Sequence, residues 1–291
     1  MLYITTALAS SFFSSLKDMV SKALAGRVDG TTSTLASFAY ALPYYSIGLI
    51  IWVIFGLPLG DLSAPFWIFV LLRSTTDAAA EWLKMSALNK AEVSLVAPFF
   101  ALSPIILLFI GPLVSGDELS LLGIVGVMLT VIGSIGLFPI RPSKASFATL
   151  KRQANLQGIG MAIVSSVFFA LNTLFDRLAV QRASIFVSAA AMTAAATIPF
   201  IIPVICFEDR RRAFVKEKSL FHLRGILQLA SMTLKLSALA GLSGAYVAGL
   251  MRLSVLATII GGRIFFDEQE TRRRLAWGSL ICFGSILIIL G

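Results

Sequence analysis

The sequence predicts an all-α polytopic membrane protein with ten transmembrane helices in two inverted five-helix repeats. Its 291 residues are 57% hydrophobic and 13% charged, and the mean hydropathy is +0.90. A soluble globular protein does not have this composition. Ten apolar runs approach the roughly 20 residues that cross the hydrocarbon core of a bilayer. They are 2–23, 33–56, 65–86, 93–114, 120–139, 156–178, 185–207, 219–239, 244–265 and 275–291.

The basic residues are distributed unevenly between the two sides of these predicted spans. Of the 24 lysines and arginines, fifteen lie in connections that follow odd-numbered spans, and only Arg182 lies in a connection that follows an even-numbered span. By the positive-inside rule the odd-numbered connections are cytoplasmic, so both ends of the chain are predicted to lie outside. The net charge of +9 is therefore assigned to membrane topology, and no nucleic-acid partner is predicted.

The chain also repeats itself. Arg73 and Lys84 in the third span match Arg224 and Lys235 in the eighth span at a constant offset. Because each copy has an odd number of spans, the second copy enters the membrane inverted, which is the usual construction of secondary transporters. A duplication retained only for stability is the alternative. The predicted units are a first five-helix repeat at 1–140, a basic linker at 141–155 and a second five-helix repeat at 156–291.

Ionisable residues form a stripe along the third span. At about 100° per residue, Arg73, Asp77, Glu81 and Lys84 fall within roughly 80° of one helix face. Charge at membrane depth costs a few kcal/mol or more per residue, so such groups usually face the interior of a bundle or a wet cavity. The stripe is therefore predicted to form the wall of a transport pathway.

Cations outnumber acids within the spans. Arg224, Lys235 and Arg252 have no acid one helical turn away, so an acid on a neighbouring helix or an anionic substrate must compensate them. An anionic or zwitterionic metabolite is thus predicted, although the outer lysines could instead extend to the membrane interface. The candidate substrate-binding residues are Arg73, Arg252, Lys235, Arg224, Gln228, Lys17 and Lys22.

Three acids are candidates for proton coupling. Asp77 and Glu81 lie one turn apart, so one of them could hold a proton near neutral pH. A fixed ladder of ion pairs that only locks the third helix is the alternative interpretation. Asp18 is a weaker candidate because Lys22 lies one turn away.

Two further features concern helix geometry. Pro98 and Pro104 predict a kinked fourth span, because a proline removes a backbone hydrogen bond. Asp117-Glu118 and Asp267-Glu268 precede the fifth and tenth spans, where acidic side chains complement helix N-termini. Capping is favoured there over a role in transport.

The second half of each repeat carries a family resemblance. Residues 86–137, SALNKAEVSLVAPFFALSPIILLFIGPLVSGDELSLLGIVGVMLTVIGSIGL, resemble the EamA-type half-repeat of the drug/metabolite transporter (DMT) superfamily, and residues 252–289 resemble its second copy. The resemblance implies ten helices in two inverted repeats around a cavity lined mainly by spans one, three, four, six, eight and nine. The family transports amino acids, sugars, nucleotide derivatives, drugs and other metabolites, so the resemblance leaves the substrate open.

The predicted function is a secondary transporter of the inner (plasma) membrane, multi-pass, that moves a small polar, anionic or zwitterionic metabolite by alternating access. Its predicted partners are the lipid bilayer, the metabolite and, in a coupled carrier, protons. It is predicted to be a monomer or a homodimer. A multidrug or amino-acid exporter of the same fold is the main alternative, and a channel or a membrane enzyme is weaker. No catalytic residue, cofactor or metal is predicted, because the chain has one histidine and two cysteines and no catalytic motif.

Overall fold

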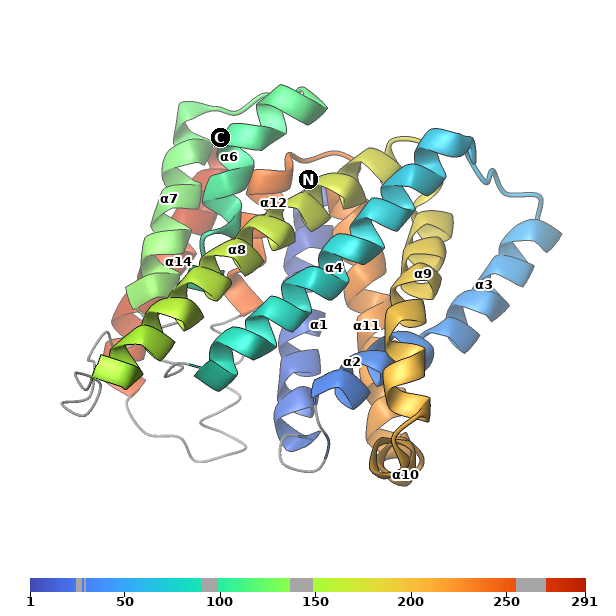
Figure 1. Cartoon of the computed structure of the whole chain (residues 1–291). Coiled ribbons are helices and arrows are strands. Elements are labelled where there is room, and N and C mark those ends of the chain that lie inside the picture. The colour runs from blue at the N-terminus through green and yellow to red at the C-terminus, as the bar shows by residue number, and fades with distance from the viewer. Residues whose placement is uncertain (25–27, 29, 91–98, 137–148, 255–270) are drawn as a thin grey trace.

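The computed structural model describes residues 1–24, 28, 30–90, 99–136, 149–254 and 271–291 (Figure 1). Within these ranges the regular secondary structure is all-α, with isolated bridge residues such as the pair Gly60 and Ala183. In chain order the helices are α1 (Leu2–Leu24), α2 (Gly30–Ala39), α3 (Leu42–Ile54), α4 (Ala64–Lys90), α6 (Ser103–Ser115), α7 (Leu121–Gly136), α8 (Thr149–Val180), α9 (Ile185–Ile205), α10 (Glu208–Lys216), α11 (Lys218–Leu239), α12 (Gly244–Leu250) and α14 (Thr271–Leu290).

The outer surface is apolar and the interior contains polar side chains. Phe109, Leu113 and Ile202 are at least 70% exposed, whereas Arg73 and Asp176 are at most 4% exposed. A water-soluble protein has the opposite distribution, and this one fits a protein whose surface faces lipid. By length and hydropathy, three described helical stretches are each able to cross a membrane: Thr34–Ile54, Leu156–Val180 and Ile185–Ile205.

Several helix boundaries differ from the predicted spans. The predicted span 33–56 is interrupted at Tyr40-Ala41, because Pro43 at the start of α3 has no N–H to donate to the preceding turn. α8 begins at Thr149, inside the predicted linker 141–155, and residues predicted to connect two spans form α10. Hydrophobicity marks the apolar part of a helix and therefore misses polar extensions of this kind.

Within the described residues, turns at Ala101-Leu102 and Met251-Arg252 interrupt the fourth and ninth predicted spans. Pro104 lies in the first turn of α6, where a missing N–H costs nothing, so it starts a helix and does not kink one. Pro98 and Asp267-Glu268 lie outside the described residues.

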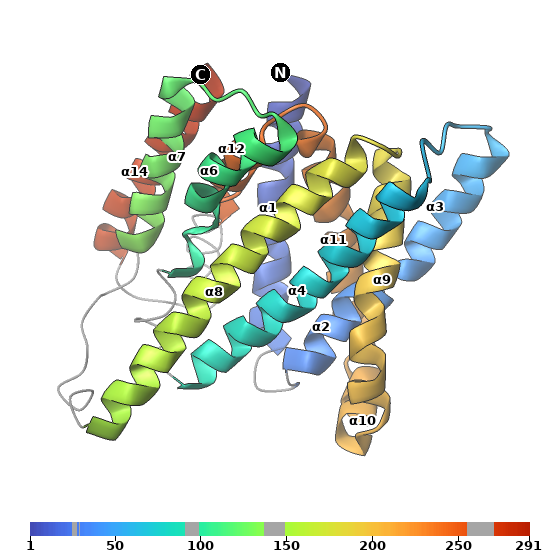
Figure 2. The same ribbon diagram turned by 45° about the horizontal axis from the view of Figure 1, so that its top comes forward.

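Helix pairs from the two halves of the chain form the centre of the molecule. The most extensive contacts join α4 to α8, α7 to α14, and α1 to α11. Figures 1 and 2 show α4 beside α8 and α1 beside α11 in the middle, with α7 and α14 at one edge and α3 at the other. The charged stripe of α4 therefore lies against helices from the second half.

The two ends of the bundle differ in charge. Both chain termini lie at one end, and α10, which carries Arg210, Arg211, Arg212 and Lys216, lies at the other (Figure 1). At the end with the termini, the connection before α4 is tied to the connection before α9, because Asp61 N donates to Arg182 O at 2.8 Å and Ser184 N donates to Leu59 O at 3.0 Å. There the hydroxyl and the backbone N–H of Ser63 hold the pKa of Asp61 below its ordinary value.

α7 and α14 pack backbone to backbone through glycines. A Cβ atom added to Gly126 would lie 2.6 Å from the carbonyl oxygen of Gly284, and one added to Gly284 would lie 2.6 Å from that of Gly126. A Cβ on Gly133 would meet Ile281 Cγ1 at 2.7 Å. These glycines are therefore close-packing sites between two helices of the chain.

We expect Gly126→Ala to lower the thermal unfolding temperature of the detergent-solubilised protein, because overpacking against a backbone atom costs about 1–3 kcal/mol. The control is Gly160→Ala in α8, where an added Cβ meets nothing within 4 Å and the higher helix propensity of alanine stabilises by up to about 1 kcal/mol. Equal unfolding temperatures for the two variants would contradict the packing argument.

Candidate functional site

A buried carboxylate, Asp176 on α8, joins three helices. Its Oδ1 accepts from Arg73 Nε of α4 at 3.2 Å, and its Oδ2 accepts from Lys235 Nζ of α11 at 2.7 Å. The Asp176 side chain is fully buried, and the Arg73 side chain is 5% exposed. Because both oxygens bind a cation, the negative charge of Asp176 is compensated within the bundle.

The same arginine also compensates the first acid of the α4 stripe. Arg73 Nη1 donates to Asp77 Oδ2 at 3.1 Å, and Asn172 Nδ2 of α8 donates to Asp77 Oδ1 at 2.7 Å. Asp77, Asp176, Arg73 and Lys235 thus form a neutral cluster. Lys235 was predicted to need either an acid on a neighbouring helix or an anionic substrate. Asp176 of α8 is that acid.

Two adjoining cavities lie beside this cluster. The first cavity, about 270 Å³, is lined by Lys17 of α1, by Arg224 and Gln228 of α11, and by the whole α4 stripe. The second cavity, about 370 Å³, is lined by Ser103, Thr173 and Arg252 among others. Their common wall comprises Ser14, Glu81, Lys84, Phe169, Asn172, Lys235 and Met251.

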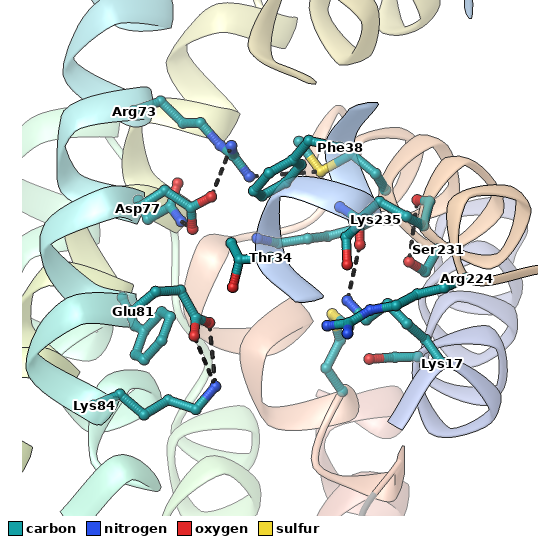
Figure 3. Close-up of a pocket in the computed structure, with 17 residues that line it drawn as sticks. Lys17, Thr34, Phe38, Arg73, Asp77, Glu81, Lys84, Arg224, Ser231 and Lys235 are labelled. Carbon is teal, nitrogen blue, oxygen red and sulfur yellow. Dashed lines mark hydrogen bonds and ion pairs between the residues drawn. The ribbon is translucent and has the colours of Figure 1, made fainter. Parts of the chain in front are cut away.

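Figure 3 shows the first cavity with the α4 stripe on one side and Lys17 and Arg224 on the other. Lys17 Nζ donates to Gln228 Oε1 at 2.9 Å. Lys84 Nζ binds Glu81 at 3.1 Å and lies 5.8 Å from the centre of the Phe169 ring. The predicted stripe on α4 and the matching stripe on α11 therefore line the same cavity.

Exposure along α4 shows which end of the cavity is open. The side chains of Arg73 and Asp77 are 5% and 11% exposed, whereas those of Glu81 and Lys84 are 27% and 36% exposed. The exposed fraction thus rises toward the C-terminal end of α4, which lies at the same end of the bundle as α10 (Figure 1). The cavity opens toward that basic end.

Arg252, just after α12, has neutral partners. Its Nη2 donates to the carbonyl oxygen of Phe100 at 3.2 Å and to Ser103 Oγ at 2.9 Å. Its Nε is buried and has no hydrogen-bond partner. Among the residues that the structure describes, the carboxylates lining the two cavities are Asp77 and Glu81, and they bind Arg73 and Lys84.

A second buried ion pair lies at the opposite end of the bundle. Arg177 Nη2 of α8 binds Asp117 Oδ1 at 2.6 Å, with these side chains 14% and 1% exposed. Arg177 also donates to the carbonyl oxygens of Leu239 and Leu242, and Asp117 Oδ2 accepts from the backbone N–H of Gly244 at 3.2 Å. Asp117 was expected to complement the N-terminus of the span that follows it. Instead it caps α12, which lies far away in the sequence.

Most of the sequence-predicted residues meet at the two cavities. Arg73, Asp77, Glu81, Lys17, Arg224, Gln228 and Lys235 line the first cavity, and Arg252 lines the second. The side chains of Asp18 and Lys22 lie outside those that the structure describes.

The candidates predicted from the sequence did not include Asp176, Asn172 or the Asp117–Arg177 pair. Asn172 and Asp176 lie one turn apart on α8, so helical periodicity in the sixth predicted span could have identified them. The Asp117–Arg177 pair has no comparable signal, since its partners are 60 residues apart.

Comparisons with known proteins agree with this architecture. The model of the EamA-like transporter family matches residues 1–138 and 156–291. The chain belongs to the EamA-like transporter family. It is therefore an integral membrane protein of a transporter family within the DMT superfamily, and families of this kind handle small substrates.

Structure comparison finds the same fold in a solved structure. One solved crystal structure superposes with a TM-score of 0.73 over 99% of this chain and 97% of that chain, at 14% sequence identity. At this identity the likeness concerns the fold alone. Among curated protein sequences, none matches the chain significantly.

We expect Asp176→Asn to destabilise the EamA-like protein by about 3–5 kcal/mol, because it leaves Arg73 and Lys235 without their shared buried counter-charge. Thermal unfolding in detergent measures the effect. The control is Asp61→Asn, whose partner Arg182 lies at 3.6 Å in an exposed pair worth about 0–1 kcal/mol. The double variant Asp176→Asn/Lys235→Met should recover part of the loss; no recovery would contradict the charge argument.

Proposed function

We propose that this EamA-like protein is a secondary transporter of small anionic or zwitterionic metabolites. The observation that carries the proposal is the pair of adjoining cavities inside the bundle, open at one end and lined by six cations: Lys17, Arg73, Lys84, Arg224, Lys235 and Arg252. Three carboxylates, Asp77, Glu81 and Asp176, oppose them there. Arg252 donates to neutral acceptors, Phe100 O and Ser103 Oγ, so an anionic group of the substrate would supply its counter-charge.

We further propose ten spans in two inverted five-helix repeats, with the division at 1–140, 141–155 and 156–291. In that scheme α1 and α8 are equivalent, as are α4 and α11, and α7 and α14. A twofold axis in the membrane plane then converts the α4–α8 contact into the α11–α1 contact and the α7–α14 contact into itself. These are the three most extensive helix contacts, which supports the scheme, as does the match of the family model to two successive ranges.

Alternating access follows from these repeats. In the described state the cavities open toward the basic end, and the Asp117–Arg177 pair closes the other end. An inverted repeat can exchange these two shapes around one site. By the positive-inside rule the open end is cytoplasmic, so the state is inward-open, with both termini outside and the protein spanning the inner membrane several times.

A proton is the proposed coupling ion, and Glu81 is the acid best situated to carry it. Arg73 and Asn172 each bind one carboxylate oxygen of Asp77. This agrees with the alternative interpretation, in which a fixed ladder of ion pairs locks the helix. Glu81 is bound by Lys84 and is 27% exposed to the cavity, so a proton can reach it. Asp77 is therefore assigned to holding the cluster together.

Transport is tested by reconstituting the protein in liposomes and measuring counterflow of labelled anionic, zwitterionic and cationic metabolites. We expect counterflow with at least one anion or zwitterion, at least tenfold above protein-free liposomes. Conductance without counterflow would indicate a channel, and counterflow of cationic drugs alone would indicate a multidrug exporter. An imposed pH gradient should stimulate uptake by the wild type and not by Glu81→Gln.

Opening of the closed end is tested by cysteine labelling. In a Cys206→Ser/Cys282→Ser background, Ala245→Cys places a thiol at a site that is 1% exposed, next to Gly244. Adding Asp117→Asn should increase its labelling by a membrane-impermeant maleimide several-fold, because the buried ion pair and the cap on α12 are both weakened.

The matched control for this labelling is Glu118→Gln, which changes an exposed neighbouring acid and should leave labelling unchanged. Equal labelling with and without Asp117→Asn, in protein that still elutes as a single species, would exclude the Asp117–Arg177 pair as the closing contact.

A further inference from the structure

Arg252 lines the second cavity beside the start of α6. Its Nη2 donates to Phe100 O at 3.2 Å and to Ser103 Oγ at 2.9 Å, and α6 begins at Ser103. These two bonds hold the guanidinium group next to a helix N-terminus, where the helix dipole also favours negative charge. This side of the second cavity therefore favours an anionic group.

The guanidinium of Arg252 has donors left for a ligand. Both of its hydrogen bonds come from Nη2 and go to neutral acceptors, while its Nε is buried without a partner. A guanidinium has five N–H donors in a planar fork that matches a carboxylate or a phosphate. Nε and Nη1 of Arg252 thus remain for an oxyanion.

The acids in the cavity walls already bind cations. Of the residues that the structure describes, Asp77 and Glu81 are the carboxylates that line the two cavities. Asp77 binds Arg73 at 3.1 Å. Glu81 binds Lys84 at 3.1 Å. An ammonium group on a ligand would have to compete with these cations, whereas an oxyanion would find Arg252 bound only to neutral groups.

The second cavity also offers apolar surface to the body of a ligand. Its volume of about 370 Å³ is within the range of sites that enclose small organic molecules. The apolar side chains in its wall are Phe100, Phe169, Ala248 and Met251. In the same wall, Asn172 Oδ1 is buried without a partner. Because this acceptor is neutral, it suits a hydroxyl group better than a second charge.

We propose that the substrate carries one oxyanionic group, which binds Arg252, on an aromatic body that packs against Phe169 and Met251 in the second cavity. The chemical class is an aryl carboxylate or an aryl phosphate monoester. This inference rests on the proposed transport of anions or zwitterions and narrows it, because Asp77 and Glu81 already bind cations and an ammonium group would lack a counter-charge.

Matched probes test the inference by calorimetry on the protein in lipid nanodiscs, with empty nanodiscs as the blank for partition into lipid. The oxyanion probes are aryl carboxylates from benzoate to phenylbutyrate, and phenyl phosphate. Three comparisons remove or add one group each: the amide of each carboxylate loses the charge, acetate lacks the aromatic body, and phenylalanine adds an ammonium group to phenylpropionate.

We expect at least one aryl carboxylate to bind at least about tenfold more tightly than its amide, than acetate and than phenylalanine, because a hydrogen bond to a charged group accounts for a factor of this size. The affinity of phenyl phosphate relative to benzoate identifies which oxyanion the site prefers.

Variants locate the oxyanion. Arg252→Gln should bring the affinity for the preferred carboxylate to within about twofold of that for its amide, and Arg252→Lys should retain part of the preference. The affinity for the amide should not change, which reports that each variant is still folded. Phe169→Ala should weaken the carboxylate and its amide alike. Arg182→Gln, at an exposed cation outside the cavities, is the control and should change neither affinity.

Equal affinities for every aryl carboxylate and its amide, or tighter binding of phenylalanine than of every oxyanion probe, would overturn the inference. An unchanged preference for the carboxylate in Arg252→Gln would overturn it as well. If zwitterions or other anions still show counterflow in liposomes, the carrier function stands and only this inference fails. If no anion or zwitterion shows counterflow, the proposed function itself fails.

Discussion

The structure depends on the compensation of one carboxylate buried inside the helix bundle. Asp176 is fully buried and binds Arg73 and Lys235 on two different helices. An isolated ion at this depth would be costly, so the position of Asp176 fixes α4, α8 and α11 relative to one another. The cavities lie beside this junction because the same helices carry the remaining polar side chains. Stability and the proposed transport thus involve neighbouring residues of the same helix faces.

Much of this site was predictable from helical periodicity. The stripe from Arg73 to Lys84 and the stripe from Arg224 to Lys235 each follow one helix face, and both line the first cavity. Periodicity identifies a polar face because a lipid-facing helix surface must be apolar. The offset between the two stripes also indicated that they belong to equivalent helices, which the packing of α4 on α8 and α1 on α11 supports.

The partners across helices could not be predicted in the same way. Lys235 and Asp176 are 59 residues apart, and Arg177 and Asp117 are 60 residues apart, so their contacts depend on the tertiary arrangement. For the same reason Asp117 could be assigned to its own helix junction and not to the cap of α12. The break at Tyr40-Ala41 and the separate helix α10 depend on local backbone chemistry that hydrophobicity does not report.

The glycine contacts between α7 and α14 limit how the protein can change shape. The carbonyl oxygens of Gly126 and Gly284 each lie 2.6 Å from the position that a Cβ atom on the other glycine would take. A shift of one residue along the helix axis, about 1.5 Å, would bring side chains such as Ile288 and Thr130 into these backbones. Sliding is therefore blocked, and the pair behaves as a rigid pillar. In the proposed alternating access, the cavity helices would therefore rock against this pillar.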